Sequence, residues 1–188
     1  MHVAGSESRL EYGADAGGRT INLRRATLDD VPLLEVWDTD PGVIAATTDD
    51  REIDRAFGGL DWRDELRHDS AVSYYLIAEL DGRPIGAMQI IDPHEEPTHY
   101  WGEIEPNLRA IDIWIGTHND RNQGYGAEMM RLAHGLCFAN PLVSAIVIDP
   151  LASNTRALAF YHRLGYVTIE HRMFGDDECL VLKLSRLT

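Results

Sequence analysis

A single acidic residue interrupts a run of apolar residues near the middle of this 188-residue chain. The run covers residues 110–116, and the acid is Asp112. If the run is a β-strand, Asp112 lies on the opposite face from its three isoleucines. An unpaired carboxylate is costly on a face that packs into the core. We therefore expect Asp112 to point into a cavity in which a cationic amine neutralises it.

A glycine-containing turn follows this strand. After a polar turn at residues 117–123, the sequence enters an apolar-periodic segment that predicts a helix, and residues 121–126 read R-x-x-G-x-G. Glycine allows positive φ and close backbone approach. The unpaired N–H groups of the helix start attract an anion, to which Arg121 can add a full charge. The same pattern alone also fits a turn that binds nothing.

The turn lacks the features of two common phosphate-binding motifs. No Gly-Lys-Ser/Thr follows, so it is not a P-loop. It is also a poor dinucleotide fingerprint, because the first strand of the chain carries no such turn and no acid on a next strand completes it.

Other acids stand where ligands bind in α/β proteins. Asp149 ends an apolar strand at 144–148, although a turn carboxylate ahead of a proline has the same signature. Residues 92–108 form a long polar loop in which Glu103, Glu105 and Trp101 could hold a polycation by charge pairing and ring stacking. A solvated acidic loop is the alternative interpretation.

The elements that must position these residues follow from periodicity. The strand–helix–strand segment at 110–148 predicts parallel pairing. We expect an α/β fold with a central twisted mixed sheet of about six to seven strands flanked by helices. Helices are expected to begin near Thr27, Gly124 and Asn154. Strands are expected at 20–25, 72–80, 84–91, 110–116, 144–148, 166–172 and 179–184.

The segment between the first helix and the second strand has weaker signals. Residues 40–42, Asp-Pro-Gly, predict a turn. Ile53 and Phe57 are four residues apart, as are Trp62 and Leu66, and each pair predicts a short helix.

The bulk composition limits the classes of function. The net charge of −14 argues against a nucleic-acid partner and favours a cationic ligand, although acidity can also serve solubility alone. No apolar run has membrane-spanning length, and residues 1–19 contain no signal-peptide stretch, so a cytoplasmic protein without a membrane partner is expected. We expect residues 1–19 to be a disordered lead-in and residues 20–188 a single domain.

Cysteine and histidine usage predicts neither a disulfide nor a metal site. Cys137 falls in the predicted helix and Cys179 in an apolar strand, which favours two buried free thiols. His94 and His99 lie in a proline-bearing loop without cysteines to complete a metal site, so no bound metal is expected.

The succession of these motifs resembles the acetyl-coenzyme A binding core of the GNAT acetyltransferase superfamily. After the glycine turn, a strand ends in Asp149-Pro150, and the chain continues as SNTRALAFYHRLGY at 153–166. Within the superfamily it looks most similar to aminoglycoside 6'-N-acetyltransferases. That similarity rests on PIG at 84–86 followed by Gln89, RAID at 109–112, and the DP and SN-x-RA motifs at 149–157. The resemblance covers about residues 20–184.

The resemblance implies where acetyl-CoA binds as co-substrate. The strands holding Asp112 and Asp149 would splay apart, and pantetheine would lie in the gap between them. The pyrophosphate would sit on the helix start. The implied coenzyme-binding residues are Ile113, Trp114, Ile115, Arg121, Asn122, Gln123, Gly124, Tyr125, Gly126, Ala127, Asn154, Ala157 and Tyr161.

The resemblance also implies catalytic and acceptor-binding roles. Asp112 would take a proton from the acceptor ammonium or lower its desolvation cost. Tyr161 would protonate the departing thiolate, although a packed helix tyrosine has the same sequence signature. The implied acceptor-binding residues are Gln89, Trp101, Glu103, Glu105, Asp112, Asp149 and Asp176.

Several acceptors stay open at this point. The preferred one is the 6'-amine of an aminoglycoside, acetylated by direct transfer in a ternary complex of a monomer or homodimer. A siderophore-type lysine or hydroxylysine acyltransferase is an alternative, but those enzymes typically carry histidine in place of Asp112. Another small amine, a protein N-terminus, or a coenzyme A-binding module without turnover are further alternatives. The chain departs from the aminoglycoside pattern at residues 38–62, which would cover the acceptor.

Overall fold

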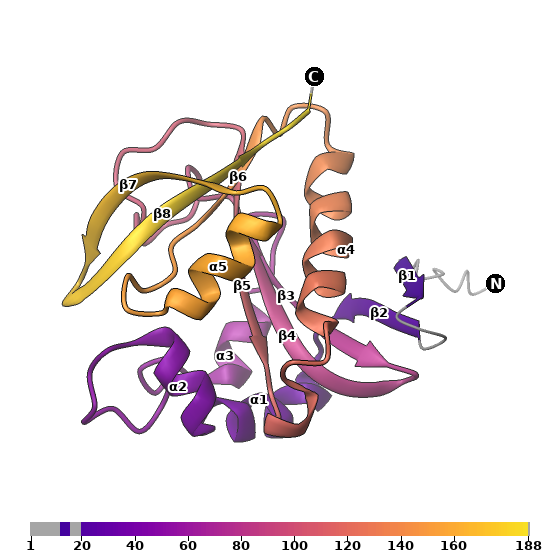
Figure 1. Cartoon of the computed structure of the whole chain (residues 1–188). Helices are drawn as coiled ribbons and strands as arrows, with labels where there is room; N and C mark the ends of the chain where they lie inside the picture. Colours follow the sequence, from indigo (N-terminus) through magenta and orange to yellow (C-terminus); the bar gives the residue numbers. More distant parts are fainter. Residues whose placement is uncertain (1–11, 16–19, 188) are drawn as a thin grey trace.

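The computed structural model describes residues 12–15 and 20–187. These residues form one eight-stranded mixed sheet in the order β1-β2-β3-β4-β5-β6-β8-β7 (Figure 1), one strand more than expected. The strands are β1 (Tyr12–Asp15), β2 (Thr20–Arg25), β3 (Ser73–Leu80), β4 (Arg83–Ile91), β5 (Leu108–Ile115), β6 (Ala145–Ile148), β7 (Val167–Phe174) and β8 (Asp177–Ser185).

The additional strand lies in the segment expected to be a lead-in. Strand β1 pairs antiparallel with β2, with Tyr12 opposite Leu23 and Asp15 opposite Thr20. Its four residues carry no clear alternation of apolar residues, which is why the sequence did not predict it. The remainder of the expected lead-in, residues 1–11 and 16–19, lies outside the described residues.

The parallel pairing predicted for the strand–helix–strand segment is confirmed. Residues 108–110 of β5 pair with residues 145–147 of β6. Beyond Ala110 the two strands part, while β5 stays paired with β4 along residues 110–115. The predicted splay is therefore present, and it leaves one edge of β5 without a strand neighbour from Ile111 onward.

Helices cover both faces of the sheet (Figure 1). Helices α4 (Tyr125–Ala139) and α5 (Thr155–Arg163) pack on the face that carries Ile111, Ile113 and Ile115. Helices α1 (Val31–Asp38), α2 (Pro41–Thr47) and α3 (Trp62–Arg67) pack on the face that carries Trp114. The alternation predicted for β5 is thus confirmed, with Asp112 on the side of α1–α3.

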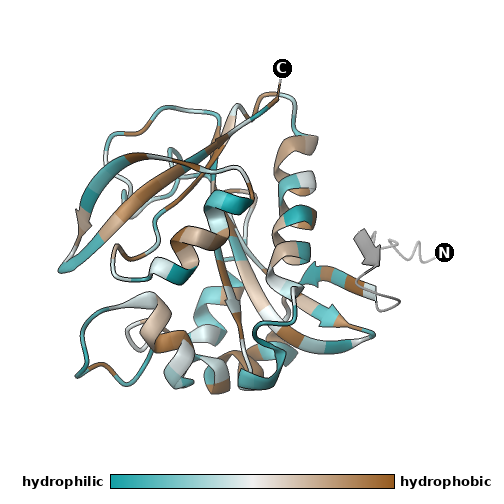
Figure 2. Cartoon of the chain, in the orientation of Figure 1, coloured by the Kyte–Doolittle hydropathy of each residue, from teal (hydrophilic) through white to brown (hydrophobic). Residues whose placement is uncertain are grey.

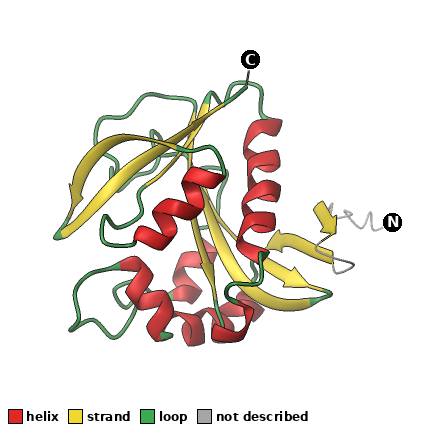
Figure 3. Cartoon of the chain, viewed as in Figure 1, coloured by secondary structure: helices red, strands yellow, loops and turns green. Residues whose placement is uncertain are grey.

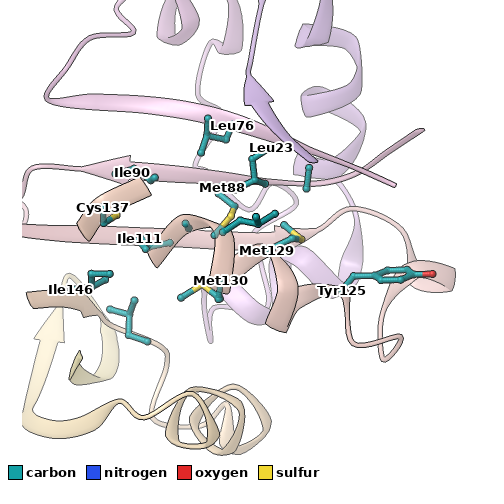
Figure 4. Packing of buried hydrophobic residues seen from close by; sticks show 14 of the residues in the cluster. Leu23, Leu76, Met88, Ile90, Ile111, Tyr125, Met129, Met130, Cys137 and Ile146 are labelled. Atoms are coloured by element: carbon teal, nitrogen blue, oxygen red, sulfur yellow. The ribbon is translucent and has the colours of Figure 1, made fainter. Parts of the chain in front are cut away.

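Helix α4 is amphipathic, and its ribbon alternates between hydrophobic and hydrophilic residues (Figure 2). Its buried residues include Met129, Met130 and Cys137, which pack against apolar side chains of the sheet such as Met88 and Ile111 (Figure 4). Burial of this stripe, rather than helix propensity alone, holds such a helix in place.

Two expectations for the segment between α1 and β3 are wrong, the first at residues 40–42 and the second around Ile53 and Phe57. Residues 40–42 begin helix α2 instead of forming a turn, because the Asp40 side chain accepts from the N–H groups of Gly42 (2.8 Å) and Val43 (3.2 Å). An aspartate cap followed by proline at the first helical position is a helix start as well as a turn signal.

The helix predicted around Ile53 and Phe57 is absent, since residues 48–61 are irregular. The buried Asp38 organises this segment: its carboxylate accepts from Phe57 N at 2.9 Å and lies 3.3 Å from Arg55 Nη1. The expected helix at Trp62 and Leu66 is confirmed as α3.

The long polar loop between β4 and β5 runs beside β7 and β8, among the green segments at the upper left of Figure 3. Trp101 is 3% exposed and packs with Leu108, Ala145 and Phe174. Arg172 of β7 donates to Trp101 O at 2.9 Å. The loop is thereby fixed to strands β5–β8 and forms one wall of the site.

Three further findings concern the described residues only. No helix among them is long and apolar enough to cross a membrane, and no group of three histidine, cysteine or acidic side chains among them could hold a metal ion. Cys137 and Cys179 are buried free thiols, as expected.

Candidate active site

A cavity of about 780 Å³ lies where β5 and β6 diverge. Its walls come from both faces of the sheet: α2, α3 and the β4–β5 loop on one side, and Asn154, Ala157 and Tyr161 at and on α5 on the other. The splay therefore connects the two faces. Asp112 and Asp149, at the two diverging strands, both line the opening.

The free edge of β5 presents backbone groups to the gap. Gly116 N donates to Ile85 O of β4 at 2.9 Å, and N–H groups alternate along a strand. The N–H groups of Ile113 and Ile115 therefore point away from β4, toward the side from which β6 has departed. An extended ligand with amide groups could pair with this edge as a further strand would.

The turn before α4 has the conformation that the glycine pattern predicts. Asn122 and Gly124 have φ of 64° and 86°, and Gly124 caps α4, so the first N–H groups of a 15-residue helix face outward. Arg156 of α5 donates to Asn122 Oδ1, which brings a second cationic side chain to this turn. The sequence motif contained Arg156, but its approach to the turn was not predicted.

Arg121 does not extend toward the helix start. Its guanidinium donates to Ile115 O (3.1 Å) and Gly116 O (3.3 Å), and it forms an ion pair with Asp40, the cap of α2. Its side chain is 17% exposed. Arg121 thus connects the glycine turn to the helix on the opposite face.

Asp112 has no hydrogen-bond or ion-pair partner among the described residues. The accessible surface of its side chain faces the cavity. The protein around the cavity shields the carboxylate from bulk water, so it is buried in the electrostatic sense. This burial and the negative charge of Asp149 raise the pKa of Asp112 to about 7. A cation in the cavity would relieve both effects. Gln89, its cross-strand neighbour on β4, also lines the cavity and donates to Ser73 Oγ at 2.9 Å.

Asp149 is held by an aromatic pair. Tyr100 donates to Asp149 Oδ2 at 2.7 Å, and its ring stacks on Phe174 at 4.6 Å and 11°. Burial raises the pKa of Asp149, and the Tyr100 hydrogen bond opposes that rise. Nothing in the sequence linked Tyr100 to Asp149, so this hydrogen bond was not predicted.

Tyr161 lines the cavity from α5 and is 9% exposed. Its hydroxyl has no hydrogen-bond partner among the described residues. Burial raises its pKa, and the charges of Asp112 and Asp149 raise it further, so this hydroxyl keeps its proton over the physiological range. Tyr161 is therefore a neutral proton donor in the same cavity as Asp112 and Asp149.

The cavity is strongly acidic. No lysine or arginine among the described residues lines it, whereas five acids do: Glu65, Glu96, Asp112, Asp149 and Asp177. Glu96 is saturated by Thr98 and Tyr100 N and is 6% exposed, so it organises its own loop. Asp177 accepts from Thr48 Oγ1 (3.1 Å) and Asp49 N (2.9 Å). The remaining acids keep capacity for a ligand cation.

The family model described as an acetyltransferase (GNAT) domain matches residues 26–174 of this chain. That range contains β5, the glycine turn and the splay.

The chain belongs to the GNAT acetyltransferase family.

Two relatives of this GNAT chain carry names that refer to aminoglycosides or to kanamycin. It is 32% identical over 102 residues to an aminoglycoside N(6')-acetyltransferase type 1 of Klebsiella pneumoniae, which covers 54% of this chain and 50% of that protein. It is also 32% identical over 72 residues to a kanamycin resistance protein of Rhizobium radiobacter, which covers 38% of this chain and 67% of that protein. The chain thus spans about half the length of the first relatives it matches.

Solved structures share the GNAT fold. An uncharacterised protein of Bacillus halodurans superimposes with a TM-score of 0.79 at 18% identity, covering 94% of this chain and 90% of that one. The aminoglycoside acetyltransferase AAC(6')-Ib, in complex with coenzyme A and kanamycin, superimposes with a TM-score of 0.73 at 24% identity, covering 88% and 95%.

The predicted acceptor residues do not all reach this GNAT cavity. Gln89, Trp101, Asp112 and Asp149 line it. Glu103 and Glu105 are exposed outside its lining, and Glu105 pairs with Lys183. Asp176 is exposed in the β7–β8 turn, and its neighbour Asp177 lines the cavity instead. A one-residue offset reverses the direction of a side chain at a strand start, which sequence position alone did not resolve.

An aromatic wall was also missed. The rings of Phe57, Trp62, Tyr75 and Trp114 contact one another at centroid distances of 4.7–6.5 Å. Phe57, Tyr75 and Trp114 line the cavity on the Asp112 side. Tyr75 and Trp62 lie on different elements from Trp114, so only the tertiary fold brings them together.

Proposed function

We propose that this protein transfers an acetyl group from acetyl-CoA to a primary amine of a cationic small molecule, by direct transfer in a ternary complex. The preferred acceptor is the 6'-amine of an aminoglycoside. The observation that carries the proposal is the unpaired Asp112 carboxylate, which lies in an acidic cavity at the point where the sheet opens.

Several groups of this structure match the parts of acetyl-CoA that they would bind. The outward N–H groups of Ile113 and Ile115 form an unpaired strand edge, which suits the amides of pantetheine. The backbone of residues 123–127 at the start of α4 suits the pyrophosphate. Asn154 is the cap of α5 and accepts from Ala157 N at 3.0 Å, so its amide N–H₂ remains available to the gap. Bound acetyl-CoA would supply the activated thioester.

The residues of the cavity would carry out the proton transfers and stabilise the charges that develop during acetyl transfer. Asp112 accepts the proton that the acceptor ammonium must lose before its nitrogen attacks the acetyl carbon. The N–H groups of the free β5 edge stabilise the charge that develops on the acetyl oxygen. As the carbon–sulfur bond breaks, Tyr161 donates its proton to the sulfur, and the second proton that the acylated nitrogen loses restores the Tyr161 hydroxyl. Asp149, held by Tyr100, adds a second negative charge that attracts the ammonium form.

The acidic lining supports a polycationic acceptor. A cavity with five acids and no lysine or arginine among the described residues concentrates cations. Relatives whose names specify N(6')-acetylation and kanamycin resistance support an aminoglycoside.

The test is a thiol-release assay with purified protein, acetyl-CoA and a panel of amines. The panel contains kanamycin, an aminoglycoside with a hydroxyl at the 6' position, hydroxylysine and lysine. We expect release with kanamycin, much less with the 6'-hydroxyl compound, and a product acetylated at N6' by NMR. Release with hydroxylysine but not kanamycin would exclude the aminoglycoside assignment. No release with any amine would exclude the enzyme assignment.

A further inference from the structure

Glu65 is a cavity carboxylate to which the transfer reaction assigns no role. It lies on α3, a six-residue helix that Asp61 caps and that Trp62 and Leu66 anchor in the apolar core beneath. This anchoring leaves Glu65 half-buried and directs it to the cavity. The predicted Trp62–Leu66 pair located the helix, but nothing in the sequence indicated that Glu65 would face the site.

One oxygen of Glu65 has a partner and the other does not. Tyr75 donates to Glu65 Oε1 at 3.0 Å. No described residue donates to Oε2, and no described arginine, lysine or histidine forms an ion pair with this carboxylate. Tyr75 is 5% exposed, so the hydrogen bond fixes the carboxylate from the protein side and leaves one oxygen for a ligand.

The aromatic wall connects Glu65 to Asp112. Tyr75 holds Glu65, and its ring packs edge-on to Trp114 at 6.5 Å. Trp114 shares a strand face with Asp112, two residues away. After burial, the charges of Glu65 and Asp112 both raise the pKa of Tyr75, which places its hydroxyl in the field of both acids. A molecule lying along Tyr75 and Trp114 would meet a carboxylate at each end.

We propose that Glu65 is a specificity-determining residue that binds a second ammonium group of the acceptor while Asp112 faces the reacting amine. This inference rests on the proposed transfer to an amine. It restricts good acceptors to molecules with at least two cationic groups separated by a ring that stacks on the aromatic wall. The glutamate thus supplies part of the acceptor contacts from α3, directly after residues 38–62, where the chain departs from the aminoglycoside pattern.

The test compares Glu65→Gln with Glu35→Gln in the full chain. Glutamine keeps an oxygen that accepts from Tyr75, so the fold is retained and only the charge is lost. Glu35 is exposed on α1 and does not line the cavity, which makes it a matched control. Each variant is assayed with neamine, which carries several amines, and with methyl 6-amino-6-deoxyglucoside, which carries one.

We expect Glu65→Gln to lower kcat/KM for neamine at least tenfold, mainly through KM, and to change that of the monoamine less than twofold. Glu35→Gln should change neither more than twofold. An equal loss on both acceptors, or no loss on neamine, would overturn the role of Glu65.

A calorimetric titration separates this inference from the proposed reaction. If the unmodified protein releases no thiol with either acceptor, the proposed function is wrong. Neamine binding in the presence of coenzyme A then decides about Glu65 on its own. An affinity at least tenfold lower for Glu65→Gln than for the unmodified protein supports the subsite, and equal affinities overturn it.

Discussion

The proposed coenzyme side and the proposed acceptor side of this molecule are lined by different kinds of groups. The coenzyme side would consist mainly of backbone: the free edge of β5, the turn at 121–124 and the first N–H groups of α4. The Asn154 side chain at the start of α5 would add to it. The acceptor side consists of side chains from α2, α3, the β4–β5 loop and the start of β8. The backbone part of the coenzyme side is contiguous in sequence over about twenty residues, whereas the acceptor side spans most of the chain.

This difference explains how each side can change. A backbone surface tolerates substitution wherever the local conformation survives, so it suits a ligand common to a whole family. A side-chain surface changes with each residue, so it suits the part of the reaction that differs between family members. Asp112 lies where the two sides meet.

The largest effect is expected at that junction. Asp112→Asn should lower kcat/KM for the acceptor about 100-fold or more, since it removes both the proton acceptor and an unpaired charge at the reacting amine. Affinity for acetyl-CoA, measured by calorimetry, should stay within twofold. Asp54→Asn, an exposed acid outside the cavity lining, is the control. A loss of only a few-fold would show that Asp112 is not part of the chemistry.

Asp112 should also determine the acidic limb of the pH profile. Because burial and Asp149 raise the pKa of Asp112 to about 7, the carboxylate that accepts a proton disappears as pH falls through that value. We expect kcat/KM for the acceptor to fall about tenfold per pH unit below that point. In Asp112→Asn the limb should be absent, although the remaining activity is low. An identical limb in both proteins would assign it to another group.

The sequence predicted the local structure of the proposed coenzyme side well because its signals are local. Gly124 at the helix start, Asn154 at the next helix and the apolar alternation of β5 each act through their own backbone neighbours. The predicted splay needed only a strand–helix–strand order and the motif resemblance. The additional strand β1 was missed because four residues of weak pattern are stabilised by pairing with β2, a tertiary effect.

The acceptor side was predicted less completely because its contacts span long separations. Tyr100 reaches Asp149 across 49 positions, and Thr48 reaches Asp177 across 129. No periodicity records such pairs. Residues 55–57 are held by the buried Asp38 and residues 48–49 by Asp177, rather than by helical hydrogen bonds, so the spacing of Ile53 and Phe57 predicted the wrong structure.

Gly116 offers a test of how closely the two sides pack. A Cβ at this position would lie 2.0 Å from the indole of Trp37 on α1, whereas one at Gly135 in α4 would meet nothing within 4 Å. Gly116→Ala should therefore lower the free energy of unfolding by about 1–3 kcal/mol through overpacking. Gly135→Ala should raise it by about 0.5–1 kcal/mol, since it removes a glycine from a helix interior. Urea unfolding measures both, and a neutral Gly116→Ala would mean that α1 shifts freely relative to β5.

The smallest expected effect concerns Arg121, where sequence pattern and geometry assign different roles. If Arg121 bound a phosphate of the coenzyme, its replacement would affect coenzyme binding alone. The observed pairing with Asp40 instead joins the glycine turn to α2 on the acceptor side. We therefore expect Arg121→Ala to cost about 1 kcal/mol of stability, the range of a partly buried ion pair, and to change KM for acetyl-CoA less than threefold.

A double-mutant cycle with Asp40→Ala decides between these roles. If the pair is the main contact of Arg121, the loss caused by Asp40→Ala should shrink by about 1 kcal/mol when Arg121 is already alanine. The part of the Asp40 loss that persists comes from its capping of α2. Arg121→Lys keeps the charge that pairs with Asp40 but loses the fork that donates to Ile115 O and Gly116 O, so its stability should lie between those of the unmodified protein and Arg121→Ala. The opposite result has two parts: the stability losses of Arg121→Ala and Asp40→Ala are additive, and Arg121→Ala raises KM for acetyl-CoA tenfold while Arg121→Lys keeps the normal KM. That result would show that Arg121 binds the coenzyme.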